Sequence, residues 1–194
     1  MNTNEQMIAE IEDHLNSVQT LMAPTFLSKI EQAATLIIET ISNGKKLLLF
    51  GNGGSASDAQ HIAAEFTGRY VKERRGLPAI ALTTDTSALT AIGNDYGFAS
   101  VFSRQVEALA QPGDLVIGIS TSGNSENVVA GLMEAKNRGC GLIGFTGENG
   151  GMVSVISNIT LNVNSSTTAR VQEMHILVGH LLCSAVDRMF APEN

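Results

Sequence analysis

The start of the chain alternates apolar and polar residues at the spacing of a helix. Residues 4–22 predict an amphipathic helix whose apolar positions recur every three or four residues: Met7, Ile8, Ile11, Leu15, Val18, Leu21 and Met22. Pro24 interrupts this pattern, and a second helix is predicted over residues 25–43, ending at the C-cap pair Asn43-Gly44. Two helices before the first strand are more than a minimal α/β domain needs. We therefore expect residues 1–43 to form a helical pair that packs against a neighbouring subunit.

The pattern changes after residue 45, where short apolar runs alternate with helical segments. The runs predict strands that are buried on both faces, at residues 46–50, 79–82, 114–120, 141–146 and 159–163. The segments between and after them predict helices at residues 55–69, 86–93, 98–109, 125–138, 150–157 and 168–190. This alternation predicts a flavodoxin-like, three-layer α/β/α sandwich with a five-stranded parallel sheet and right-handed crossovers. Without an internal repeat or a linker, residues 1–194 are expected to form one domain.

Composition narrows the class of protein. Hydrophobic residues make up 43% of the 194 positions, enough for a core without disulfides, and Cys140 and Cys183 lie in apolar surroundings typical of core cysteines in a reducing compartment. No basic and apolar leader opens the sequence, and no apolar run approaches the roughly 20 residues of a membrane span. A net charge of −7 argues against nucleic-acid binding. We expect a cytoplasmic protein with neither a membrane nor a nucleic-acid partner.

One basic cluster stands against this acidic background, formed by Arg69, Lys72, Arg74 and Arg75. Cations at a helix end interact favourably with the helix dipole, so the cluster fits a solvated helix terminus. It fits equally well a site in which Arg69 contacts an anion.

A glycine-rich turn follows the first predicted strand. Residues 51–56 match the dinucleotide fingerprint G-x-G-x-x-A, but that site also needs an acidic residue about 20 positions later, at the end of the second strand. Here the second strand is followed by Asp85, nearly 30 positions after the motif, which disfavours dinucleotide binding. A tight strand–helix turn is the structural alternative, with Ser55 and Asp58 as a capping box.

A second loop is rich in hydroxyl groups. Residues 120–125, Ser-Thr-Ser-Gly-Asn-Ser, follow an apolar strand and precede a helix. Hydroxyls and free amides at a helix N-terminus favour binding of a phosphate monoester, although Ser125 alone would also serve as an ordinary N-cap. The segments 51–57, 83–87, 120–125 and 146–151 all follow predicted strands, at the sheet edge where parallel α/β folds bind ligands.

Two helices carry polar side chains suited to metal binding or proton transfer. His61 and Glu65 lie four residues apart and so share one helical face. The last helix carries Gln172, His175 and His180 among apolar residues, where a polar side chain needs a partner or a site. Gln172 and His180 share a face but lie roughly 12 Å apart along the axis. They would meet one metal only by leaning together or by coming from different subunits, whereas His175 fits a core or interface histidine.

Taken together, four segments in this order resemble the sugar isomerase (SIS) domain family and, within it, the phosphoheptose isomerases. They are Gly51-Asn52-Gly53-Gly54-Ser55 with His61 and Glu65, Leu89-Thr90-Ala91-Ile92-Gly93-Asn94-Asp95, Ile119-Ser120-Thr121-Ser122-Gly123-Asn124-Ser125, and Arg170-Val171-Gln172-Glu173-Met174-His175 with His180. The resemblance covers essentially the whole chain.

The resemblance implies interconversion of D-sedoheptulose 7-phosphate and D-glycero-D-manno-heptose 7-phosphate through an enediol. This is the first step toward the ADP-heptose of the lipopolysaccharide core. It also implies a homotetramer, Glu65 and His180 as the catalytic acid–base pair, and one Zn²⁺ per subunit bound by His61, Glu65, Gln172 and His180. Substrate contacts would fall on Asn52, Gly53, Gly54, Ser55, Glu65, Asn94, Asp95, Ser120, Thr121, Ser122, Ser125 and Gln172.

Two points qualify the resemblance. Some relatives carry an acidic residue where this chain has Ala169, so that carboxylate is absent or is supplied elsewhere. A non-catalytic member of the family, which binds the replication initiator protein, resembles the isomerases but lacks the metal and acid–base positions. This chain retains His61, Glu65 and His180, which favours an enzyme over such an adaptor. A metal-free isomerase of another sugar phosphate is a third hypothesis.

Overall fold

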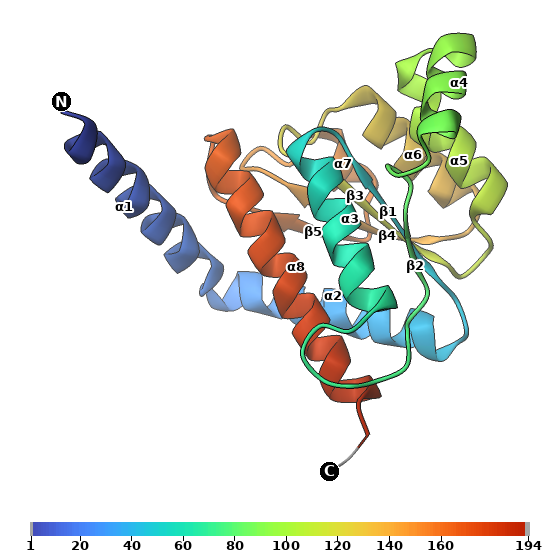
Figure 1. The fold of residues 1–194 in the computed structure, drawn as a ribbon, viewed down its shortest axis with the longest axis horizontal. Helices are drawn as coiled ribbons and strands as arrows, with labels where there is room; N and C mark the ends of the chain where they lie inside the picture. Colours follow the sequence, from blue (N-terminus) through green and yellow to red (C-terminus); the bar gives the residue numbers. More distant parts are fainter. Residues whose placement is uncertain (1, 193–194) are drawn as a thin grey trace.

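A computed structural model describes residues 2–192 of the chain as a parallel sheet between two helical layers (Figure 1). The strand order is β2-β1-β3-β4-β5, and every neighbouring pair is parallel. The strands are β1 (Leu47–Gly51), β2 (Ala79–Ala81), β3 (Leu115–Ser120), β4 (Gly141–Thr146) and β5 (Ile159–Asn162). The fold class predicted from the sequence is confirmed.

The helices divide between the two faces of the sheet. One face packs against α2 (Pro24–Ser42), α3 (Gly54–Thr67) and α8 (Thr168–Phe190). The other face is covered by α5 (Val101–Leu109), α6 (Glu126–Asn137) and α7 (Gly151–Ile156), with α4 (Thr86–Tyr96) and a short 3₁₀ turn, Phe98–Ser100, beside α5. Every residue of β1 and β3 is buried, as expected for central strands covered on both faces.

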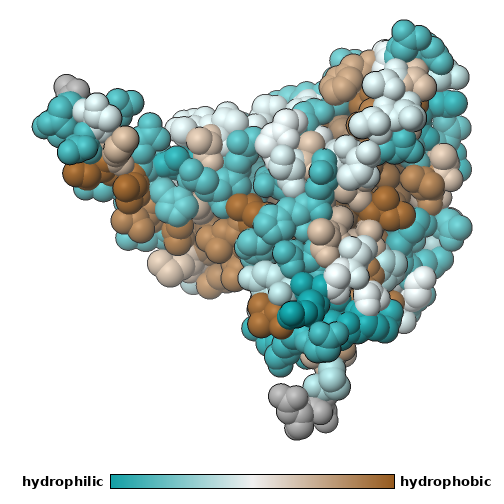
Figure 2. Space-filling model, viewed as in Figure 1, coloured by the Kyte–Doolittle hydropathy of each residue, from teal (hydrophilic) through white to brown (hydrophobic). Residues whose placement is uncertain are grey.

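The first helix, α1 (Thr3–Leu21), projects from the body as an arm (Figure 1). Polar contacts tie it to α8: Arg170 donates to the carbonyl of Glu10, and His14 Nδ1 lies 2.7 Å from a carboxylate oxygen of Glu173. Its apolar side chains, seen along one side of the arm in Figure 2, are each more than half exposed: Met7, Ile8, Ile11 and Leu15. These four side chains have no apolar partner within the described part of the chain, whereas Val18 and Leu21 at the end of the helix pack on the core.

The predicted helices and strands are all present, with ends that differ by at most a few residues, but the capping box at Ser55 and Asp58 is wrong. The N-cap of α3 is Gly53, whose φ of 55° is a left-handed value that glycine adopts without strain. Ser55 is already inside the helix and buried, so its hydroxyl does not cap the helix. No helix among residues 2–192 is both long enough and apolar enough to cross a membrane.

Candidate active site

The helices α3 and α8 approach closely because a glycine lies at their contact. A Cβ atom at Gly179 would lie 2.6 Å from Cδ1 of Ile62, so no larger residue fits there without a shift. This contact brings His61 and Glu65 of α3 opposite His180 of α8. The Nε2 atom of His61 lies 3.2 Å from Oε1 of Glu65 and 3.4 Å from Nε2 of His180.

These three side chains form a set of donors suited to a metal ion. One ligand atom from each lies within 4.8 Å of the other two, and His61 is exposed to solvent while Glu65 and His180 are half-buried. Two imidazole nitrogens and a carboxylate oxygen are ligands that zinc prefers, and donors of a tetrahedral zinc ion lie roughly 3.3 Å apart. The spacings of His61 to Glu65 and to His180 match that value.

Asp58 lies one turn before His61 on α3, and sequence reasoning assigned it only a capping role. Its Oδ2 atom is buried and has no hydrogen-bond partner among the described residues. Burial raises the pKa of this carboxyl to about 6, although the nearby His61 acts to lower it. Its spacing of three residues from His61 was the only signal in the sequence that it belongs beside the histidines.

Gln172 lies apart from the three side chains within one chain. Its amide packs against Gly54, and a Cβ atom there would overlap the side chain. Gly54 precedes His61 by seven residues, which is about 10 Å along the helix axis. The structure therefore places Gln172 beside the glycine turn at the edge of the sheet, and not with His61 and Glu65.

The hydroxyl-rich loop after β3 folds so that its serines converge. The Oγ atom of Ser120 lies 2.9 Å from Oγ of Ser125 and 3.4 Å from Oγ of Ser122. Ser125 occupies the N-cap position of α6, yet its hydroxyl makes no capping hydrogen bond and faces Ser120. Gly123, with φ of 68°, packs against the loop after β4 so closely that a Cβ would overlap the carbonyl of Gly150. The hydroxyls thus gather at the start of a helix.

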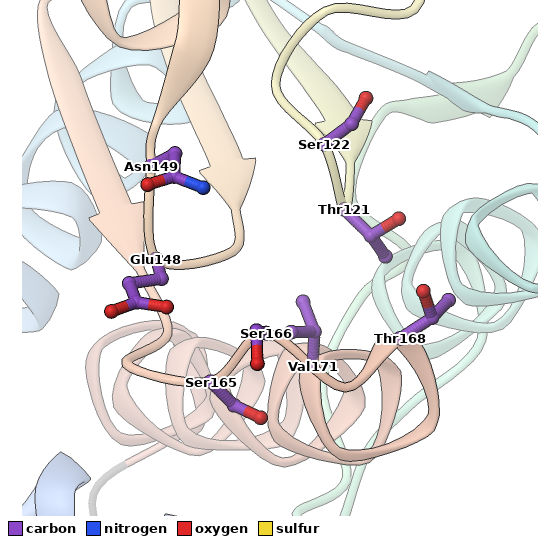
Figure 3. Close-up of a pocket in the computed structure, with 8 residues that line it drawn as sticks. All are labelled: Thr121, Ser122, Glu148, Asn149, Ser165, Ser166, Thr168 and Val171. Carbon is purple, nitrogen blue, oxygen red and sulfur yellow. The ribbon is translucent and has the colours of Figure 1, made fainter.

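A pocket of about 190 Å³ opens beside this loop (Figure 3). Its walls come from the ends of three strands: Thr121 and Ser122 after β3, Glu148 and Asn149 after β4, and Ser165, Ser166, Thr168 and Val171 around the start of α8. Thr121 and Ser122 were predicted, and Glu148 and Asn149 lie in the segment 146–151 that was expected at this edge, whereas the residues around the start of α8 were not predicted as pocket residues. Their signal was available, because a run of hydroxyl residues, 165–168, follows β5 as 120–122 follow β3.

The remaining predicted substrate contacts are spread around the same end of the sheet. Asn52 exchanges two hydrogen bonds with the buried amide of Asn127, at 2.8 and 2.9 Å. Asn94 and Asp95 lie on α4, where they are exposed and Asn94 donates to Asp95 at 2.7 Å. No hydrogen bond joins these two residues to the serine loop within the described chain. Gly53, Gly54 and Ser55 form the turn that opens α3.

Two further expectations are decided by burial. His175 is 1% exposed, and burial lowers its pKa to about 4, so the neutral ring donates from Nε2 to the carbonyl of Thr146 at 3.1 Å. The prediction of a core histidine is confirmed. The basic cluster is not a uniformly solvated helix end, because the side chain of Arg74 is fully buried against Asp187. Arg69 is exposed and pairs with Glu73 at 3.5 Å.

Comparison with known proteins gives a consistent result. A family model for the SIS domain matches residues 9–147. The chain is 56% identical over 183 residues to the phosphoheptose isomerase of Aliarcobacter butzleri, covering 94% of each chain. It is 57% identical over 172 residues to that of Aquifex aeolicus, covering 89% of this chain and 90% of the relative.

Solved structures agree with the sequence matches. The phosphoheptose isomerase of Neisseria gonorrhoeae superposes with a TM-score of 0.91 at 45% identity, over 96% of this chain and 100% of that one. The enzyme of the same name from Francisella tularensis gives a TM-score of 0.92 at 37% identity, over 97% and 100%. The similarity therefore extends over the whole fold.

Proposed function

The chain belongs to the sugar isomerase (SIS) domain family, and from that premise we propose how its residues carry out the reaction for which its relatives are named. It is an isomerase that interconverts D-sedoheptulose 7-phosphate and D-glycero-D-manno-heptose 7-phosphate. The observation that carries this conclusion is the meeting of His61, Glu65 and His180 in a chain more than half identical to phosphoheptose isomerases. Nothing in the comparisons supports the adaptor that binds the replication initiator.

The phosphate of the sugar is proposed to bind the hydroxyl-rich loop at the start of α6. Ser120, Ser122 and Ser125 direct their hydroxyls toward one another, so an anion could accept several hydrogen bonds at once. Amides and the positive end of a twelve-residue helix add to this attraction. Thr121 and the pocket beside it would then hold the sugar chain, with Ser165, Ser166 and Glu148 as further polar contacts.

Glu65 and His180 are proposed to form the acid–base pair. Ketose–aldose isomerisation moves a proton between adjacent carbons through an enediol, so one group takes the carbon-bound proton while another manages protons on oxygen. Both side chains are half-buried and face His61 from different helices. One removes the proton from carbon and returns it to the neighbouring carbon. The other exchanges the proton between the two oxygens.

The same side chains are proposed to hold zinc, one ion per subunit. His61, Glu65 and His180 fit the ion by donor type and by spacing. When bound, zinc would stabilise negative charge that develops on the enediolate oxygens. Gln172, the fourth predicted ligand, packs at Gly54 in the same chain, so in this proposal it reaches the ion of a neighbouring subunit or contacts the substrate.

A homotetramer is proposed because several features of the protomer lack partners. The apolar side of α1, formed by Met7, Ile8, Ile11 and Leu15, is exposed, and no residue of α4 is buried. Helix α2 of the predicted pair already packs on the sheet of its own protomer, so α1 is the part of residues 1–43 that would pack against neighbouring subunits. The exposed α4 could likewise face a neighbouring subunit, with Asn94 and Asp95 contributing to a site there. We further propose that the chain is one cytoplasmic SIS domain that acts early in the supply of activated heptose for lipopolysaccharide.

A turnover assay on a panel of sugar phosphates, with and without a chelator, tests this proposal. The chain is expected to convert sedoheptulose 7-phosphate in preference to ketose phosphates of five or six carbons, to lose activity with the chelator and to regain it with added zinc. Full activity after complete metal removal would contradict the zinc site. Equal turnover of all the sugar phosphates would contradict the heptose specificity.

A further inference from the structure

The imidazole of His180 is held between two other rings. Its centroid lies 5.0 Å from that of His61 in an edge-on arrangement and 5.3 Å from that of Tyr70, with only 29° between the planes of the latter pair. Tyr70 therefore covers one face of the ring, while Nε2 of His180 points toward His61.

This stacking replaces a contact that ligand histidines usually have. A histidine that binds a metal normally donates its second ring N–H to a carboxylate or carbonyl, which fixes the orientation of the ring. Among residues 2–192, Nδ1 of His180 makes no hydrogen bond with another protein group. The stacked ring of Tyr70 lies against the face of this imidazole instead.

Tyr70 comes from the loop of residues 68–78, which leaves α3 and passes beside the C-terminal half of α8 on its way to β2 (Figure 1). Asp187 of α8 anchors this loop. Its Oδ2 atom accepts from the backbone amides of Val71 and Lys72, at 2.8 and 2.9 Å. Burial alone would raise the pKa of Asp187, but these amides and the guanidinium of Arg74 hold it below its usual range.

Arg74 completes the anchor from the other side. Its side chain is fully buried; Nε donates to Oδ1 of Asp187 at 2.7 Å, and Nη2 donates to the carbonyl of Glu65 at 2.8 Å. Nη1 donates to the carbonyl of Phe66 at 2.9 Å. The same ion pair therefore fixes the end of α3 that carries Glu65, the position of the loop and the helix that carries His180.

We propose that Tyr70 is a positioning residue whose ring, held in place by Asp187 and Arg74, orients His180 toward His61 and Glu65. The inference rests on the proposed role of His180 in metal binding and proton transfer. In this role Tyr70 acts through its contact with His180.

Two variants of Tyr70, one that keeps the aromatic ring and one that removes it, test this role together with a control at a neighbouring residue. Tyr70→Phe keeps the stacked ring, Tyr70→Leu removes it, and Val71→Ala changes an exposed side chain in the same loop while keeping the backbone amide. In metal-free protein, zinc affinity is measured by competition with a chelator. Loss of a residue that orients a ligand typically weakens metal binding about 10–100-fold, which is the expectation for Tyr70→Leu. Tyr70→Phe and Val71→Ala should bind zinc as the wild type does.

The orientation of the ring is measured separately by NMR with histidine-selective labelling, using His180→Gln to assign the signals. A stacked aromatic ring shifts the His180 ring protons upfield, so this shift should persist in Tyr70→Phe and disappear in Tyr70→Leu. Asp187→Asn, which removes the charge that anchors the loop, should reduce both the shift and the zinc affinity.

Unchanged zinc affinity in Tyr70→Leu, or ring-proton shifts that do not depend on residue 70, would overturn the proposal. The NMR signals are recorded without metal. An absence of zinc binding by the wild-type chain would therefore contradict the proposed metal site, while the signals would still decide whether Tyr70 orients His180.

Discussion

Acidification should destabilise this protein through one buried histidine. His175 is 1% exposed, and burial lowers its pKa from the ordinary 6.5 to about 4. Between these two values the unfolded chain binds a proton on this side chain and the folded chain does not. The free energy of unfolding therefore rises as the pH rises across this window and decreases as the pH falls.

The size of the effect follows from the two pKa values. At pH 7 both states are mostly neutral at this position, whereas at pH 5 the unfolded imidazole is almost fully protonated and the folded one is not. Linkage then makes the free energy of unfolding about 2 kcal/mol smaller at pH 5 than at pH 7. Replacing His175 with a side chain that does not titrate should remove this part of the pH dependence of the free energy of unfolding.

The assay is urea unfolding of the metal-free wild type, His175→Gln and His175→Phe at several pH values from 7 to 5. Both variants lose stability at every pH because the packing of the ring beside Phe145 changes. The carbonyl of Thr146 keeps a hydrogen bond from the amide of Val163 in each case. The prediction concerns only the slope, which should be flatter in both variants than in the wild type by about 2 kcal/mol over this range.

The carboxyl of Asp58 changes stability with pH in the opposite direction, and its effect cancels in the comparison. The pKa of Asp58 is raised from 3.8 to about 6, so between these two pH values the folded chain holds a proton on this carboxyl and the unfolded chain does not. Its contribution to stability is lost as the pH rises through about 6, in the wild type and in both variants alike. If the variants and the wild type lose the same free energy from pH 7 to pH 5, His175 is not a buried neutral imidazole and the reasoning fails.

Two further changes test separate parts of the site and the assembly. Gly54→Ala should displace the amide of Gln172, because a Cβ at that position overlaps it, and should lower turnover about 10-fold or more with little loss of stability. The control Ser57→Ala, on the exposed side of α3, should leave turnover unchanged. Unchanged turnover in Gly54→Ala would show that the placement of Gln172 is unimportant. Ile11→Asp should dissociate the assembly in sedimentation velocity without unfolding the protomer, because the side chain lies on the exposed apolar side of α1; an unchanged sedimentation coefficient would place the interface elsewhere.

The sequence was sufficient for the fold because its strands are short, continuous apolar runs bounded by turn residues. The run from Leu47 to Phe50 is entirely buried, and nothing in it competes with a strand. The start of α3 was harder to place. Ser55 and Asp58 have the spacing of a capping box, but the left-handed backbone of Gly53 starts the helix two residues earlier.

The site was predictable in its residue types and less so in its geometry. His61 and Glu65 share a face because of the helical repeat, but their approach to His180 depends on how closely α3 packs on α8. That distance is set by Gly179 against Ile62, a contact between residues 117 positions apart that no local pattern encodes.

Other parts of the site depend on burial, which periodicity does not report. The raised pKa of Asp58 comes mainly from desolvation in the folded chain. The ion pair of Arg74 with Asp187 joins residues 113 positions apart, and the sequence offered Arg74 only as part of a basic cluster. The sequence already indicated that Gln172 and His180 lie too far apart along the helix to meet one metal ion easily. Within a single chain the structure keeps Gln172 beside Gly54, away from the proposed ion.

Glu65 and His180 are proposed to carry the proton transfer of heptose phosphate isomerisation. The most direct test of this role is the turnover of sedoheptulose 7-phosphate by Glu65→Gln and His180→Gln, with Glu107→Gln on the surface of α5 as the control and circular dichroism to verify folding. Loss of an acid–base group is expected to lower turnover about 10²–10⁴-fold in the first two variants and to leave the control unchanged. Wild-type turnover by both folded variants would contradict the account.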